Sequence, residues 1–142
     1  MGLTHDRRTE LLAACPLFGG VGGEDLAAVA DRAIEVDFPA GHVIARQGEI
    51  GTGFFVIEAG GARVVQDGQE RARLGPGDFF GEMSVIDGLP RVAQVIATAD
   101  TRCLALPSWE FERLIVEHPT IGLAIIRGLS SRLRSRAEQP QH

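Results

Sequence analysis

Residues 77–93 read GDFFGEMSVIDGLPRVA and form the most informative pattern in the chain. Gly81 allows the backbone to approach a ligand closely, and residues 82–86 can make one short helical turn. The first N–H groups of such a turn have no intrahelical partner, which makes them an anion site. The Gly88-Leu89-Pro90 turn then brings Arg91 back, where its guanidinium can offer a planar fork to a phosphate.

Two interpretations of Glu82 and Arg91 stay open from this chemistry alone. A carboxylate fits beside an anion if Glu82 accepts a hydrogen bond from a sugar hydroxyl attached to that anion. Alternatively, Glu82 and Arg91 form an ion pair that only closes the loop. The residue types favour neither interpretation over the other.

The flanking sequence predicts short strands between two pairs of helices. Apolar runs punctuated by Gly, Pro or Asp predict strands at residues 43–45, 54–57, 62–65, 72–74, 92–98 and 103–106. Asp67-Gly68 is a strong hairpin signal. Apolar residues at helical spacing predict helices at residues 4–14, from Glu24-Asp25 onward, from Trp109 to about residue 117, and from residue 120 onward. Ser108 and Thr120 are expected to cap the last two.

The expected fold is mainly β, an antiparallel jelly-roll barrel (double-stranded β-helix) flanked by N- and C-terminal α-helices. Residues 1–142 are expected to form a single domain, with helices at about 4–33, the barrel at about 34–106 and the C-terminal helices at about 108–137. Residues 139–142 are expected to fray.

Composition narrows the function. The chain has no apolar run long enough to span a membrane and no secretory signal, so we expect a cytoplasmic protein with no membrane partner. Its net charge of −5 argues against direct DNA binding by this chain. No catalytic motif or metal-ligand spacing is present, so we expect no enzyme activity, metal or cofactor. Cys15 and Cys103 are interpreted as reduced buried thiols rather than a redox pair.

Residues 77–93 resemble the phosphate-binding cassette of the cyclic nucleotide-binding domain, which occurs in catabolite activators, regulatory subunits of cyclic-AMP-dependent kinase and cyclic-nucleotide-gated channels. The family pattern of Phe-Gly-Glu, an aliphatic and a small residue matches residues 80–84, and its Pro-Arg-small-Ala matches residues 90–93. Gln47-Gly48-Glu49, Gly60 and Gly77-Asp78 match the flanks. The resemblance extends over about residues 9–136.

The resemblance implies a role for each residue of the cassette. Glu82 accepts a hydrogen bond from the ribose 2′-hydroxyl, and Arg91 pairs with the exocyclic phosphate oxygens. The phosphate is further bound by the backbone N–H groups of Met83, Ser84 and Ala93. The ligand-binding residues expected on this basis are Phe80, Gly81, Glu82, Met83, Ser84, Arg91, Val92, Ala93, Val64 and Arg136.

The resemblance also implies which residues surround the base. Val64 and Met83 are expected against the base or sugar. Arg136 either stacks on the base or belongs to a solvated, basic helix end. Val92 replaces the Ser, Thr or Ala common in the family and offers no hydroxyl donor, so we expect a bias toward cAMP over cGMP. Gln94 replaces a small hydroxyl residue, with no effect predicted.

Three functions are consistent with the sequence. The leading one is a cyclic-nucleotide sensor that relays binding through its C-terminal helices to an unknown effector protein or a second copy. The alternatives are the effector domain of a Crp/Fnr-type transcription regulator that lacks its helix-turn-helix, and a degenerate barrel that binds proteins only. One apolar stripe predicts either a homodimer contact or packing on the barrel, namely Ile121, Ile125, Leu129 and Leu133.

Overall fold

The computed structural model describes residues 2–50 and 53–138. The predicted fraying of residues 139–142 lies outside this range. The helical elements are α1 (His5–Ala13), η1 (Pro16–Phe18), α2 (Gly23–Arg32), α3 (Glu82–Asp87), α4 (Ser108–Glu117) and α5 (Pro119–Glu138). The strands are β1 (Ile34–Phe38), β2 (Val43–Ala45), β3 (Gly53–Ala59), β4 (Ala62–Gln66), β5 (Gln69–Leu74), β6 (Phe79–Phe80), β7 (Gln94–Ala97) and β8 (Thr101–Pro107).

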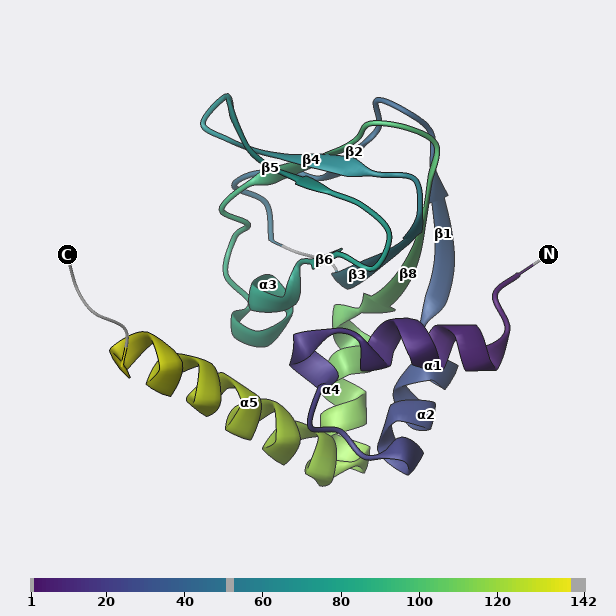
Figure 1. Ribbon diagram of the computed structural model, residues 1–142, viewed down its shortest axis with the longest axis vertical. Helices are drawn as coiled ribbons and strands as arrows, with labels where there is room; N and C mark the ends of the chain where they lie inside the picture. Colours follow the sequence, from purple (N-terminus) through teal and green to yellow (C-terminus); the bar gives the residue numbers. More distant parts are fainter. Residues whose placement is uncertain (1, 51–52, 139–142) are drawn as a thin grey trace.

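The strands form two four-stranded sheets, ordered β1-β8-β3-β6 and β2-β7-β4-β5, and every pairing is antiparallel. The sheets lie together on one side of the helices (Figure 1). The expected mainly β fold with flanking helices is therefore confirmed. Within residues 2–50 and 53–138 the two sheets remain separate hydrogen-bonded ladders, so closure into a jelly-roll barrel is not confirmed and stays a prediction.

One apolar cluster fills the space between the sheets. Phe55 on β3 and Phe80 on β6 stack with ring centroids 5.1 Å apart. The other buried members come from both sheets, namely Ala45, Ile57, Ala62, Val95, Cys103 and Ala105. Alternation of side chains along each strand directs these residues inward, as the period of a β-strand requires. This cluster supports one wall of the site described below.

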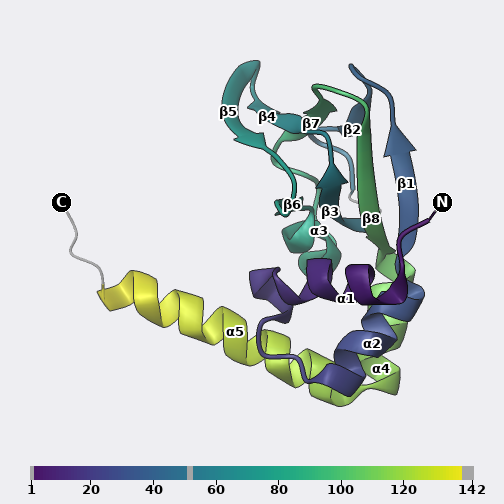
Figure 2. The same cartoon turned by 45° about the vertical axis from the view of Figure 1, so that its right-hand side comes forward.

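A second cluster joins the helices to the opposite face of β3 and β8. Phe18 of η1 meets Phe54 of β3 edge to face, with centroids 5.7 Å apart. Leu12, Val29 and Leu114 are almost completely buried beside them. The first helices, α4 and the start of α5 thus pack as one layer beneath the sheets. The rest of α5 leads away from that layer, so the last turn of α5 and the first turn of α1 lie on opposite sides (Figures 1 and 2).

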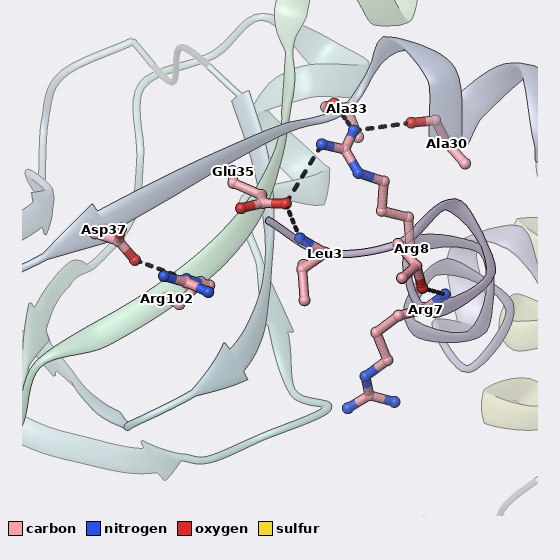
Figure 3. Close-up of polar contacts among 9 residues, drawn as sticks. Leu3, Arg7, Arg8, Ala30, Ala33, Glu35, Asp37 and Arg102 are labelled. Carbon is pink, nitrogen blue, oxygen red and sulfur yellow. Dashed lines mark hydrogen bonds and ion pairs between the residues drawn. The ribbon is translucent and has the colours of Figure 1, made fainter. Parts of the chain in front are cut away.

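Ionic contacts fix the first two helices to β1 (Figure 3). The guanidinium of Arg8 donates to the carbonyl oxygens of Ala30 and Ala33, at the C-terminal end of α2. Its second nitrogen lies 3.5 Å from the carboxylate of Glu35, which also accepts a hydrogen bond from the N–H of Leu3. A cation is favourable at this end of a helix because unpaired carbonyl oxygens gather there. Arg8 therefore orients α1 and α2 against the sheet.

Several predicted boundaries need correction. The strand predicted at residues 92–98 begins only at Gln94. The predicted caps at Ser108 and Thr120 are wrong, because Pro107 holds the cap position of α4 and Thr120 lies inside α5, which begins at Pro119. The hydroxyl of Thr120 instead donates to the carboxylate of Asp25 on α2. The strands β1 and β6 were not predicted.

The two cysteines are free and buried, as the sequence predicted. They lie in different apolar clusters. Burial raises the pKa of the Cys15 thiol to about 12, with a smaller effect of the Glu82 carboxylate. Burial likewise raises the pKa of Cys103 to about 12, helped by Asp37. In the part of the chain that the structure describes, no helix has both the length and the apolar character to cross a membrane.

Candidate ligand-binding site

Gly81 sets the geometry at the start of α3. Its φ of 91° is left-handed, and a Cβ at this position would lie 2.6 Å from the carbonyl oxygen of Gly53. Only glycine adopts this conformation and tolerates this approach without strain. The first intrahelical bond of α3 runs from the N–H of Val85 to the carbonyl of Gly81, at 3.2 Å. The N–H groups of residues 82–84 precede that bond, so they have no acceptor within the helix.

Arg91 is held in place through its backbone and its side chain. The N–H of Gly48 donates to the carbonyl of Arg91 at 2.8 Å, and the N–H of Arg91 donates to the carbonyl of Glu49 at 2.7 Å. The guanidinium Nη2 donates to the carbonyl of Gly53 at 3.0 Å. The side chain is half-buried, and this burial lowers its pKa.

The guanidinium of Arg91 has no carboxylate partner among the ion pairs that the described residues form. The alternative interpretation, a loop-closing ion pair with Glu82, is therefore not found. A half-buried cation that contacts only a neutral carbonyl retains most of its capacity to bind an anion. The open side of α3 lies next to it.

A cavity of about 220 Å³ lies between α3, the loop after it and sheet β2-β7-β4-β5. Its lining residues are Val64, Phe79, Phe80, Gly81, Glu82, Met83, Ser84, Arg91, Val92, Ala93 and Val95. The structure thus brings together every site residue predicted from the sequence except Arg136. Arg136 lies in the last turn of α5, which leads away from the sheets (Figures 1 and 2), and it does not line this cavity.

The side chains at the cavity differ in exposure. Phe80 and Ser84 are buried, whereas Met83 and Val92 are 63% and 64% exposed. Val64 on β4 lies directly opposite Val95 on β7 and forms an apolar floor with it. The cavity therefore offers a cation and free N–H groups near a carboxylate at one side, and an apolar surface at the other. That combination suits an anion joined to a ring.

Three parts of the site were missed by sequence reasoning. Phe79 lines the cavity, although only Phe80 was predicted. Its place within residues 77–93 could have identified it. Val95 was findable from alternation along its strand. The carbonyl of Gly53, which accepts from Arg91, carries no side-chain signal in the sequence at all.

Another cavity, of about 540 Å³, lies where β1 ends and β8 begins. Its lining includes the carboxylates of Asp37, Glu58 and Asp100, and its Arg102 pairs with Asp37 at 3.0 Å. The excess of negative charge opposes anion binding there. Among residues 2–50 and 53–138, no group of three or more His, Cys, Asp or Glu side chains is arranged to hold a metal ion.

Comparison with known proteins agrees with the geometry of the smaller cavity. Residues 35–118, more than half of the chain, match the family model of the cyclic nucleotide-binding domain. A CRP-like cAMP-activated global transcriptional regulator of Mycobacterium tuberculosis is 32% identical over 130 residues, which cover 88% of this chain and 58% of that protein. A cyclic nucleotide-gated potassium channel of Rhizobium etli is 38% identical over 120 residues, covering 84% of this chain and 33% of the channel.

A solved structure shows the same arrangement of elements. The N-terminal domain of a transcriptional regulator from Streptomyces coelicolor superposes with a TM-score of 0.81 at 27% identity, over 90% of this chain and 92% of that domain. The chain spans 58% or less of the length of the curated relatives described above. These matches include the segment that carries Gly81, Glu82 and Arg91. The chain belongs to the cyclic nucleotide-binding domain family.

Proposed function

We propose that this chain is a sensor domain that binds cAMP in the cavity beside α3 and passes the binding event on through α5. It would act by binding alone, without catalysis or a cofactor. The observation that carries the proposal is the half-buried guanidinium of Arg91, which faces the cavity and has no carboxylate partner among the described ion pairs. A cyclic phosphate would supply the missing negative charge.

Each polar group at the cavity has a role in this proposal. The guanidinium of Arg91 pairs with the exocyclic phosphate oxygens, and the N–H groups of Met83, Ser84 and Ala93 donate to the same phosphate. The carboxylate of Glu82 accepts from the ribose 2′-hydroxyl. Its position in the first turn of α3 keeps it beside the phosphate without requiring an ion pair to Arg91.

The apolar part of the cavity sets the preference for the base. Val64 and the exposed side chain of Met83 lie against the base or sugar. Val92 lines the cavity without a hydroxyl that would bind the amino group of guanine. This absence favours cAMP over cGMP. Two relatives, a cAMP-activated transcriptional regulator and a cAMP-dependent protein kinase regulatory subunit, are consistent with that choice.

The relay through α5 rests on how this helix is attached. Ile121 and Ile125 are buried in the helical cluster, whereas Leu133 further along is 69% exposed. Leu129 also packs partly against that cluster, so the first three residues of the apolar stripe are anchored and the last is exposed. Leu133 and the neighbouring exposed Ile126 are available to a second copy or an effector protein. For Arg136 to reach the base, α5 must first swing toward the cavity.

A second candidate function is the ligand-binding part of a transcription regulator. The solved Streptomyces coelicolor domain, which this chain matches over almost its full length, is the N-terminal domain of such a regulator. In that case DNA binding would reside in another segment or protein. A barrel that binds only proteins is a weaker candidate, because Gly81, Glu82 and Arg91 all line the cavity.

Titration calorimetry with cAMP and cGMP tests the proposal. We expect heat with cAMP, and a roughly tenfold or greater loss of affinity in Arg91→Ala because a charge-assisted contact is removed. Arg71→Ala is the matched control, since Arg71 is an exposed arginine on β5 outside the cavity. Absence of heat with both nucleotides at millimolar concentration would contradict the proposal. Equal losses in both variants would place the phosphate elsewhere.

A further inference from the structure

A reciprocal pair of hydrogen bonds joins Gln47 to the turn between β4 and β5. The Gln47 carboxamide donates through Nε2 to Oδ1 of Asp67 at 2.8 Å. Its Oε1 accepts from the backbone N–H of Asp67 at 3.0 Å. Asp67 has a φ of 53° and is the one non-glycine residue with positive φ in residues 2–50 and 53–138. The carboxamide therefore satisfies both the side chain and the backbone of the least relaxed residue in that turn.

The residues that follow Gln47 hold Arg91 from the other side. The N–H of Gly48 donates to the carbonyl of Arg91, and the N–H of Arg91 donates to the carbonyl of Glu49. An isolated antiparallel bridge between Ile50 and Pro90 continues this contact. Gly48 has a φ of 84°. This conformation lets the chain turn between Gln47, which contacts Asp67, and residues 49–50, which contact residues 90–91. Residues 47–50 thus connect the hairpin tip to the backbone of Arg91.

Residues 47–50 join two segments that line opposite walls of the cavity. The hairpin strand β4 contributes Val64 to the floor, and the loop after α3 contributes Arg91. Strand pairing between β4 and β7 joins these walls deeper in the sheet. Near the exposed tip, Gln47 links them through residues 47–50. A change in the turn at Asp67 would therefore be passed to the Arg91 backbone.

We propose that Gln47 and Asp67 are positioning residues for the ligand, because their reciprocal pair holds the backbone of Arg91 at the distance from Val64 that the nucleotide requires. This inference rests on the proposed function, in which Arg91 binds the phosphate. Neither residue touches the cavity, since neither is among its lining residues. Both side chains are exposed, so replacing them leaves no buried polar group unpaired.

A double-mutant cycle isolates the pair. Gln47→Glu brings a second carboxylate to the Asp67 side chain, so the Nε2 donor is lost and the two groups repel each other. Asp67→Asn alone keeps an acceptor oxygen, and Asn tolerates positive φ well. In the double variant the amide introduced at position 67 donates to the carboxylate introduced at position 47. The other oxygen of that carboxylate still accepts from the backbone N–H of residue 67, so two hydrogen bonds again join the two positions. Gln69→Glu, at the other side of the same turn, is the control for added negative charge.

The first measurement is the dissociation constant for cAMP by calorimetry. We expect Gln47→Glu to weaken binding roughly threefold to tenfold, the effect of losing one or two exposed hydrogen bonds. Asp67→Asn and Gln69→Glu should remain within about twofold of the parent chain. The double variant should recover most of the lost affinity. Failure of the double variant to recover it would overturn the inference, because the loss of affinity would then not arise from the contact between residues 47 and 67.

The second measurement needs no ligand. Amide hydrogen exchange followed by NMR should show faster exchange at the N–H of Arg91 in Gln47→Glu, and a rate close to the parent in the double variant. The N–H of Leu104, deep in β8, should be unaffected. An unchanged Arg91 rate in Gln47→Glu would overturn the inference. If the parent chain bound neither nucleotide, the proposed function would fall, and these exchange rates would still decide whether the turn positions Arg91.

Discussion

Arg91 and Gly53 are joined by a hydrogen bond of 3.0 Å from the guanidinium to a backbone carbonyl, directly over the position where Gly81 has no side chain. The carbonyl oxygen of Gly53 thus fixes the position of the guanidinium and leaves no room for a side chain at the turn into α3. A Cβ on residue 81 would lie 2.6 Å from that carbonyl and 3.0 Å from Nη1 of Arg91. The three residues therefore form a single constraint on the cavity.

Gly81→Ala should damage stability and binding together. The positive φ and the contact with the Gly53 carbonyl should lower the free energy of unfolding by about 1–3 kcal/mol, as measured by urea unfolding. Displacement of Arg91 should also weaken cAMP binding. Gly75→Ala is the control, because a Cβ there meets nothing within 4 Å. Equal stability of the two variants would show that the turn adapts to a side chain.

Val92→Thr should narrow the preference between the two nucleotides. Val92 lines the cavity and is 64% exposed, so a side chain of the same shape with a hydroxyl should leave the unfolding free energy nearly unchanged. The added hydroxyl should improve cGMP affinity roughly fivefold to tenfold relative to cAMP. Parallel calorimetry with both nucleotides checks this ratio. An unchanged ratio would mean that residue 92 does not face the base.

Alanine substitution of two adjacent isoleucines on α5 should have very different effects on the free energy of unfolding. Ile125 is 4% exposed and Ile126 is 63% exposed. Ile125→Ala should lower the free energy of unfolding by about 2–5 kcal/mol because it leaves a cavity in the helical cluster. Ile126→Ala should change the stability of the monomer by less than about 0.5 kcal/mol.

The same pair tests association of two copies through α5. If α5 pairs with a second copy, sedimentation equilibrium should show a weaker dimer in Ile126→Ala than in the parent chain. A strong loss of monomer stability in Ile126→Ala would instead mean that α5 packs back on its own chain.

The two buried thiols should control stability at alkaline pH. The chain has no tyrosine and no lysine, so between pH 9 and 12 the side chains that titrate are Cys15 and Cys103. Burial holds both thiols protonated in the folded state, whereas they ionise from about pH 9 once unfolded. Unfolding then releases protons, and the free energy of unfolding should fall as pH rises, by up to about 1.4 kcal/mol per pH unit for each thiol.

Urea unfolding at several alkaline pH values measures this slope. The double variant Cys15→Ala and Cys103→Ala should be less stable at neutral pH, because two buried groups are truncated, but nearly independent of pH across that window. Each single variant should show about half of the parent slope. A slope that survives in the double variant would mean that other groups govern alkaline unfolding.

The local chemistry of the site was predictable, and its long-range contacts were not. An anion site was predictable from Gly81, Glu82 and Arg91, because a glycine, a carboxylate and a guanidinium at that spacing are chemically distinctive. The sequence could not decide between a phosphate site and an ion pair, because the answer depends on where the Arg91 side chain points. The structure turns it toward the Gly53 carbonyl, an acceptor that every residue carries and that no sequence pattern marks.

The same limit applies to the fold. The Asp67-Gly68 hairpin was predictable because both residues adopt positive φ, which follows from their types. The two missed strands are defined by their partners: β6 is two residues long and exists as a strand only because it pairs with β3. Thr120 is a common cap residue, yet Pro119 already starts the helix and leaves the hydroxyl free to reach Asp25.

The length of α5 converts small adjustments at its anchored end into large displacements at its tip. Twenty residues at the helical rise make a rod of about 30 Å. If such a rod tilts by about 10° where it leaves the helical cluster, its far end travels on the order of 5 Å. Rearrangements beside the cavity can reach α5 without passing through the sheets, because Val85 of α3 lies in the same buried cluster as Ile121 and Ile125 of α5.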